Sequence, residues 1–452
     1  MKRLLLVFLL FIPVAGFAES DSVVLQKIRE EILLHGTCYA NLRVLTKTIG
    51  HRLSGSPAAA KAVQWGLSCM RASGADTAWL QPVWVPHWVR GKESLEIKVP
   101  GSKSFTPIRM LSLGNSRGNG KPVEATVLMV QNFDAFNKLS SQEVAGKIVF
   151  FNYRFRQDLV SPFAAYGDAI KYRAFAPTVV AQKGGAGVII RSLSSGEDDE
   201  PHTGMTRIVD SIRKIPSVAV GNMGADALEA ACKKGTVIAR VLTSGRMMDS
   251  VLSYNVIGEL RGSEFPNEYV IVGGHLDSWD VGEGAVDDGA GCVQSIEVLR
   301  AIKALGIPPK RSIRAVLFMN EENGVRGGHA YADSAKARNE KHILAMESDA
   351  GGFTPRGIGL EMPEEKKAII RKWAPLFEPL QAADFTRDEG GTDIDPLAKM
   401  GTPLAGLNPD PQRYFEYHHT SQDKLEAVNH RELKMGAAVM ASLIYLVSEH
   451  GL

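Results

Sequence analysis

The sequence predicts an α/β protein in which a mixed, mostly parallel sheet is sandwiched by helices and a small β-rich domain is inserted. In the C-terminal half, buried-type strands alternate with amphipathic helices, a pattern typical of parallel strands covered on both faces. Between residues 101 and 243 the pattern changes to short β-branched runs separated by glycine and polar turns. We therefore expect one domain from residues 19–100 and 244–452, with 101–243 inserted into it.

The composition is that of an ordinary globular protein. Of 452 residues, 44% are hydrophobic and 23% are charged, which excludes collagen-like, disordered and coiled-coil chains. The length is enough for two or three domains with a substantial core. Lys and Arg number 52 against 50 Asp and Glu, a formal net charge of +2. Because no strong basic field exists, we expect neither nucleic acid nor a membrane surface as a partner.

The first 18 residues have the pattern of a secretory signal peptide. Lys2 and Arg3 precede an apolar run from residue 4 to 12, and the small residues Gly16 and Ala18 stand before the expected cleavage point. A membrane anchor is the alternative, but the apolar stretch is shorter than the ~20 residues that span a bilayer. We expect cleavage after Ala18 and export, either to a periplasm or out of the cell. No lipid-anchor signal is visible.

Four cysteines are present, at Cys38, Cys69, Cys232 and Cys292. They are too sparse for a disulfide framework, and their spacing does not suit a thiolate zinc site. We expect buried thiols, with one bridge as the alternative.

Three elements are predicted before the insertion. Apolar residues at helical spacing indicate a helix near residues 23–33, and a second helix is expected over 57–70. Residues 78–85 alternate as a strand does, but Pro82 and Pro86 remove backbone donors, which favours a sheet edge. Within the insertion we expect a helix over 176–183 and strands over 125–130, 147–151, 187–190 and 217–220.

The C-terminal half continues with regularly alternating elements. Helices are expected over 289–305 and near 327–336, and strands over 269–273, 312–319, 343–346 and 403–407. Ligands of such sheets bind beyond the carboxyl ends of the strands.

Metal-ligand residue types follow all four of these strands. They are His275 and Asp277, Glu321 and Glu322, Asp349, and His418 and His419, together with Asp287 and Asp288 in the turn before the first helix. One such residue alone usually caps a helix or fills a turn. Together, however, they suit two zinc ions that share a carboxylate, a device that activates water in aminopeptidases.

On these residues the chain resembles the co-catalytic di-zinc aminopeptidase and glutamate carboxypeptidase family. The strings GGHLDSWDVGEGAVDDGAG and NEENGVRGG, with GHRLSGSP at residues 50–57, are similar to its carboxypeptidase Q branch. The insertion resembles a protease-associated domain through AGKIV and AGVII, at 145–149 and 186–190. The resemblance implies the zinc aminopeptidase fold, two zinc ions per chain and a homodimer.

The resemblance also implies a set of metal ligands. His275 and Asp349 would hold one zinc, Glu322 and His419 the other, and Asp287 would bridge them.

Two further roles follow from the same resemblance. Glu321 would be the general base, and Asp277 would accept a hydrogen bond from the second ring nitrogen of His275 and so fix its tautomer.

Two pairs of neighbours leave alternatives open. Asp288 competes with Asp287 as the bridge, although the position of Asp287, twelve residues after His275, favours it. His418 and His419 should point in opposite directions on an extended segment, so that only one reaches the site; the family pattern His-Thr favours His419. The family also implies a cis peptide bond between the two aspartates.

The remaining candidates are weaker. We interpret His51, His87, His202 and His329 as surface or helix-cap residues, and Asp333, Asp384 and Asp388 as solvated charges. Residues 390–396 resemble a substrate-pocket loop of the family. Tyr414 and Tyr417 either donate to an oxyanion or simply pack, and Arg387 and Arg413 either bind a terminal carboxylate or lie exposed. Nothing in the insertion assembles into a catalytic cluster.

We expect an exported di-zinc exopeptidase that hydrolyses small peptides, above all dipeptides with a free amino end, through a metal-bound hydroxide with Glu321 as the base. A metal-free receptor-like binding protein and a single-zinc glutaminyl-cyclase-like enzyme are the alternatives. The ligand set does not separate aminopeptidase from carboxypeptidase.

Overall fold

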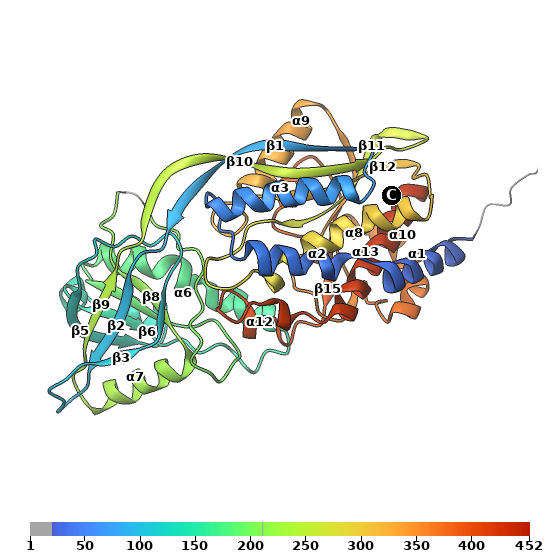
Figure 1. Cartoon of the computed structure of the whole chain (residues 1–452). Helices are drawn as coiled ribbons and strands as arrows, with labels where there is room; N and C mark the ends of the chain where they lie inside the picture. Colours follow the sequence, from blue (N-terminus) through green and yellow to red (C-terminus); the bar gives the residue numbers. More distant parts are fainter. Residues whose placement is uncertain (1–19, 210) are drawn as a thin grey trace, which may run out of the picture.

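The computed structural model describes residues 20–209 and 211–452 (Figure 1). The expected signal peptide lies outside the described residues. Within the described part of the chain, no helix has the length and apolar character needed to cross a membrane.

The first sheet has seven strands in the order β1-β10-β12-β11-β13-β15-β14. Its four central strands β12, β11, β13 and β15 run parallel, whereas β1, β10 and β14 are antiparallel to their neighbours. The bounds are β1 (Thr77–Val89), β10 (Arg246–Leu260), β11 (Phe265–His275), β12 (Arg311–Phe318), β13 (Lys341–Glu347), β14 (Pro355–Glu361) and β15 (Leu404–Pro409). This sheet confirms the predicted mixed α/β class, and β1 lies at the edge as its prolines indicated.

Helices cover both faces of this sheet because alternate residues of each strand point to opposite sides. Val270 and Val272 of β11 pack into the core cluster of one face, and Ile271 into that of the other. The first face is covered by α1 (Asp21–His35), α3 (Pro57–Ala72), α8 (Ala290–Ala304), α10 (Glu364–Arg371) and α13 (His430–His450). The second is covered by α9 (Arg326–Ala337) and α11 (Asp395–Ala398).

The second sheet has eight strands in the order β3-β2-β9-β5-β6-β7-β8-β4 and forms a separate body in Figure 1. Its strands are β2 (Glu93–Lys98), β3 (Thr106–Ile108), β4 (Met110–Ser112), β5 (Val123–Val130), β6 (Ile148–Phe151), β7 (Gly187–Arg191), β8 (Ser217–Val220) and β9 (Ile238–Thr243). Four helices accompany it, α4 (Phe133–Asn137), α5 (Ser141–Val144), α6 (Pro162–Gln182) and α7 (Asn222–Lys234). Strand β2 precedes residue 101, where the insertion was expected to begin.

Strands β1 and β10 lead into and out of this second body. They pair with each other from Thr77 opposite Glu259 to Val89 opposite Arg246. The chain therefore enters and leaves the second body along one two-stranded ribbon, visible between the two bodies in Figure 1.

Helix α6 is much longer than the predicted segment 176–183. It begins at Pro162, which occupies the first turn, and the Ser161 side chain caps it by accepting a hydrogen bond from the Ala164 amide. Its buried residues, which include Ala165, Ala169 and Arg173, recur every three or four positions, but the buried face carries a charge while Phe175 is exposed. Because hydrophobicity does not separate the two faces, the helical period is hard to detect from the sequence.

All four cysteines are free thiols. Cys38 and Cys292 are buried and the other two are half-buried, so the alternative with one disulfide is wrong.

Candidate metal centre

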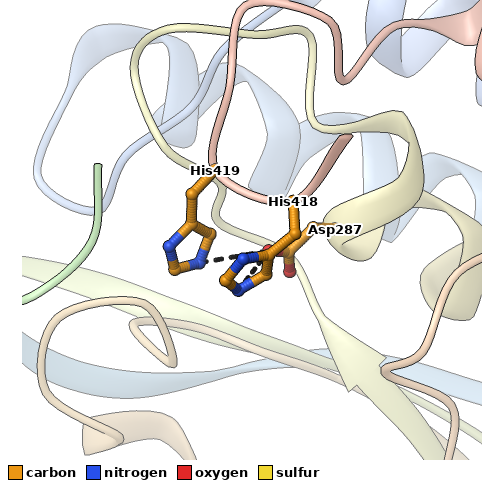
Figure 2. A group of neighbouring side chains, drawn as sticks. All are labelled: Asp287, His418 and His419. Atoms are coloured by element: carbon orange, nitrogen blue, oxygen red, sulfur yellow. Dashed lines mark ion pairs between the residues drawn. The ribbon is translucent and has the colours of Figure 1, made fainter. Parts of the chain in front are cut away.

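The carboxyl ends of the parallel strands meet at one edge of the first sheet, and the polar residues that follow them converge there. Strand β11 ends at His275, Glu321 and Glu322 follow β12, and Asp349 follows β13. Short helix α12 (Tyr414–Tyr417) follows β15 and ends at His418. Figure 2 shows His418 and His419 beside Asp287, which lies in the segment η2 (Ala285–Gly289), where Asp287 and Asp288 have non-helical backbone angles.

Asp287 lies between His275 and His419, with one carboxylate oxygen toward each. Its Oδ1 is 3.0 Å from His275 Nε2, and its Oδ2 is 3.2 Å from His419 Nε2. The same His275 nitrogen is 3.3 Å from Asp349 Oδ1, and the same His419 nitrogen is 3.1 Å from Glu322 Oε2. The structure thus brings all five residues expected as ligands together, in the two expected pairs. Their role as ligands stays a prediction.

The chemistry of this donor set fits metal ions. Two overlapping groups, His275 with Asp287 and Asp349, and Asp287 with His418 and His419, each place their donor atoms within 4.8 Å of one another. Burial, reinforced by the charge of Asp287, raises the pKa of both Glu322 and Asp349. Asp349 Oδ1 is buried without a hydrogen-bond partner. A divalent cation would balance these crowded carboxylates, because buried charges need a counter-charge.

Asp288 has a different role from its neighbour. Its Oδ2 accepts a hydrogen bond from the His275 amide at 3.0 Å, and its Oδ1 accepts one from the Gly291 amide at 2.9 Å. Asp288 thus holds the strand end against the following helix, which leaves Asp287 as the residue between the histidines. The expected cis peptide bond joins the two aspartates.

The expectation that His418 and His419 point in opposite directions is wrong. Their rings stack with centroids 3.5 Å apart, and His418 Nε2 is 3.9 Å from Asp287 Oδ2 (Figure 2). The segment is not extended, because α12 ends at His418 and His419 adopts a left-handed backbone with φ of +62°. Both histidines therefore reach the site, with His419 nearer to Asp287.

The expected contact of the Asp277 side chain is also wrong. His275 Nδ1 is 3.0 Å from the backbone oxygen of Asp277 but 3.9 Å from its carboxylate. The carboxylate instead accepts hydrogen bonds from the amides of Asn320 and Glu321, at 2.7 and 3.1 Å. The His-x-Asp spacing does not specify which oxygen faces the ring. Asp277 therefore positions the loop that carries Glu321, while its carbonyl fixes the His275 tautomer.

Glu321 lines the same cavity as the candidate ligands Asp287, Glu322, Asp349 and His419. Burial raises its pKa to about 8, with the nearby carboxylates of Asp349 and Asp287 adding to the effect and His275 opposing it. Glu321 therefore holds a proton more readily than an exposed glutamate does, a property of a group that accepts and releases protons.

The cavity above these residues has a volume of about 790 Å³ and is formed by both bodies of the molecule. Helix α6 contributes Phe163, Tyr166 and Arg173, and the segment after β7 contributes Arg207. The sequence showed no catalytic cluster in the insertion, and the structure adds that the insertion lines the cavity. The local signal that could have indicated this contribution is Arg173, a charged residue in a helix rich in alanine.

Other residues considered from the sequence have simpler positions. Residues 390–392 line the cavity, as the resemblance implied. Arg387 and Arg413 are partly exposed and lie near Asp384 and Glu416, outside the cavity lining.

His202 is not a surface residue. It is buried beside His418, neither ring nitrogen has a hydrogen-bond partner, and burial lowers its pKa to about 3. Tyr414 is also buried, lines the cavity and stacks on Phe163.

This chain is similar to known proteins in both sequence and architecture. Residues 255–444 match the model of peptidase family M28. Human carboxypeptidase Q is 35% identical over 413 residues, which covers 91% of this chain and 85% of the human protein. The crystal structure of a peptidase M28 precursor from Shewanella amazonensis is 31% identical, with a TM-score of 0.90 over 95% of this chain and 96% of that one. A zinc aminopeptidase from Bacillus subtilis, 20% identical, shares the fold with a TM-score of 0.64 over 91% of this chain and 94% of its own.

Proposed function

The chain belongs to peptidase family M28 and is a metallo-exopeptidase, and from that premise we propose that it holds two zinc ions and hydrolyses dipeptides with a free amino end. The observation that carries this proposal is the position of Asp287 between two His–carboxylate pairs. One carboxylate shared by two sites is the arrangement that co-catalytic zinc pairs use.

Each zinc would have its own protein ligands beside the shared aspartate. His275 and Asp349 would hold one ion, and Glu322 and His419 the other. When bound, the pair would polarise the scissile carbonyl and lower the pKa of the attacking water. Imidazole and carboxylate donors are the ligands that catalytic zinc prefers.

Glu321 is the general base of this proposal. It accepts a proton from the attacking water and returns it to the leaving amine, work that contributes ~10²–10⁴ to the rate. Asp277 supports it by holding the amide of Glu321 itself at 3.1 Å.

The charges around the cavity support a dipeptide as the substrate. Glu347 and Glu389 lie in its lining, as do Arg173 and Arg207 from the insertion. Glu347 Oε1 is buried without a hydrogen-bond partner and suits a substrate ammonium group. Arg207 suits the terminal carboxylate, which guanidinium groups bind well. A free dipeptide carries an ammonium group and a carboxylate close together, and so suits a cavity lined by both acidic and basic side chains.

We also propose export, which rests on the signal-peptide pattern of the first 18 residues. Homodimer formation rests on the resemblance alone. Light scattering of the purified mature chain tests it, with twice the chain mass as the expected result.

The first experiment measures metal content and hydrolysis of a dipeptide panel by the mature chain. We expect two zinc ions per chain, and cleavage of free dipeptides but not of amino-acetylated ones. In Glu321→Gln we expect both zinc ions to remain while kcat falls by ~10²–10⁴. Glu365→Gln, an exposed glutamate on α10, is the matched control and should behave as the unaltered chain does. Zinc without turnover of any peptide would contradict the proposal.

A further inference from the structure

We propose that Arg173 of the insertion is a positioning residue for the metal ligand His419, so that the second body completes the metal site rather than only covering it. The inference rests on the proposed function, because it concerns the site that His419 and Glu322 would share. It goes further because the residues that would fix the tautomer of His419 belong to the second body of the molecule.

The argument begins with the two ring nitrogens of His419. Nε2 faces Glu322 and Asp287, so a metal bound there needs the proton on Nδ1. That Nδ1 lies 3.2 Å from the backbone oxygen of Thr203, which is 216 residues away in the sequence. The Thr203 carbonyl is the acceptor that a metal-binding tautomer of His419 requires.

Thr203 is bound to His419 in a second way. Its amide donates a hydrogen bond of 3.0 Å to the backbone oxygen of His419. One residue of the insertion thus contacts both the backbone and the ring of one candidate ligand. The position of the Thr203 carbonyl then decides the orientation of that ring.

Arg173 holds this carbonyl in place. Its Nη1 donates to Thr203 O at 3.4 Å and lies 3.3 Å from His419 Nδ1, while Nη2 donates to the Tyr166 hydroxyl at 2.5 Å. In the metal-binding tautomer Nδ1 carries a proton and accepts nothing, so Arg173 and His419 would both donate to the oxygen of Thr203. The guanidinium group is then a second donor to the oxygen that accepts from the His419 ring.

Two features distinguish Arg173 from an ordinary structural arginine. It is buried, yet it forms no ion pair with a carboxylate of the described residues, an arrangement that costs stability. The guanidinium also packs against Gly204, where a Cβ would lie 2.4 Å from Arg173 Cζ. Arg191, the other buried arginine of the same body, instead pairs with Asp226 at 2.6 Å.

The experiment measures zinc affinity by competition with a chromophoric chelator at fixed pH, site by site, in the full mature chain. We expect Arg173→Met to weaken one of the two zinc ions by ~10–100-fold, the usual effect of losing an outer partner of a metal ligand, and to leave the other unchanged. Arg173→Lys should recover part of the loss, because an ammonium group can still donate to Thr203 O. Gly204→Ala, which displaces the guanidinium group without removing it, should weaken the same ion.

Side-chain ¹⁵N NMR of histidine-labelled protein supplies a second readout. In the zinc-loaded chain we expect a protonated Nδ1 for His419, and in Arg173→Met we expect that signal to broaden or disappear. Arg191→Lys is the matched control and should keep both zinc affinities. Thermal unfolding of the metal-free variants shows whether each one folds.

The outcomes separate the two proposals. If the unaltered chain binds no zinc, the proposed function fails. If it binds two and a folded Arg173→Met binds both equally well, only the role of Arg173 is wrong. Equal losses in Arg173→Met and Arg191→Lys would also overturn that role, because they would reflect general damage to the insertion.

Discussion

His275 and His419 lie on either side of Asp287, but the molecule holds them in opposite ways. His275 is fixed locally: its Nδ1 faces the carbonyl of Asp277, two residues away, and its amide is held by Asp288, 13 residues away. His419 is fixed by Thr203 and Arg173, which are 216 and 246 residues away and belong to the other body. One half of the site is therefore complete within the first sheet, whereas the other half depends on how the two bodies meet.

The largest effect should come from removing the histidines themselves. We expect His275→Ala and His419→Ala each to lose one zinc ion and to reduce kcat/KM by more than ~10²-fold, because a direct ligand contributes more than an outer partner. Metal analysis and steady-state kinetics check this. If either change released both ions, the division into two separately held halves would be wrong.

A smaller effect is expected from Asp277→Asn. The His275 ring contacts the backbone oxygen of Asp277, so zinc affinity should change less than tenfold. The amides of Asn320 and Glu321 lose a charged acceptor, and hydrogen bonds to charged groups contribute ~1.5–3 kcal/mol. We therefore expect kcat to fall by ~10-fold or more, as measured on a free dipeptide. A loss of zinc with unchanged kcat would show instead that the carboxylate serves His275.

The smallest effect should come from Arg207→Ala on the insertion side of the cavity. Arg207 would contact only the substrate, so we expect KM for free dipeptides to rise ~10-fold with kcat unchanged, the signature of lost uniform binding. Carboxyl-amidated dipeptides provide the control, because they lack the charge that Arg207 would bind. An equal rise in KM for amidated substrates would contradict this role.

The locally held half of the site is also the half that the sequence predicted best. Short, buried-type apolar runs located the parallel strands of the first sheet to within a few residues. Because strand ends meet at one sheet edge, His275, Glu322 and Asp349 could be grouped without a structure. Spacing alone did not reveal that the Asp277 carboxylate accepts hydrogen bonds from the loop after β12, because residue spacing does not specify where a side chain points.

His419 was expected as a ligand, but the contacts that hold it from the second body were missed. No periodicity connects Arg173 or Thr203 with His419, because contacts between distant segments depend on the packing of whole domains. The left-handed backbone of His419 was equally unexpected, since most residues avoid that region. The interpretation of His202 as a surface or helix-cap residue was wrong because its burial depends on contacts between distant segments.

The ribbon of β1 and β10 has a mechanical consequence for the cavity. Two strands joined along their length, from Thr77 opposite Glu259 to Val89 opposite Arg246, bend more readily than they stretch or shear, because stretching and shearing break the hydrogen bonds of the ladder. Across the cavity the second body is held again by the hydrogen bonds between Thr203 and His419. The two bodies are therefore joined at two places, by the β1–β10 ribbon, which can bend, and by the hydrogen bonds between Thr203 and His419. Because this second contact involves a residue that we propose as a zinc ligand, a bend of the ribbon that moved the second body would also change the orientation of the His419 ring.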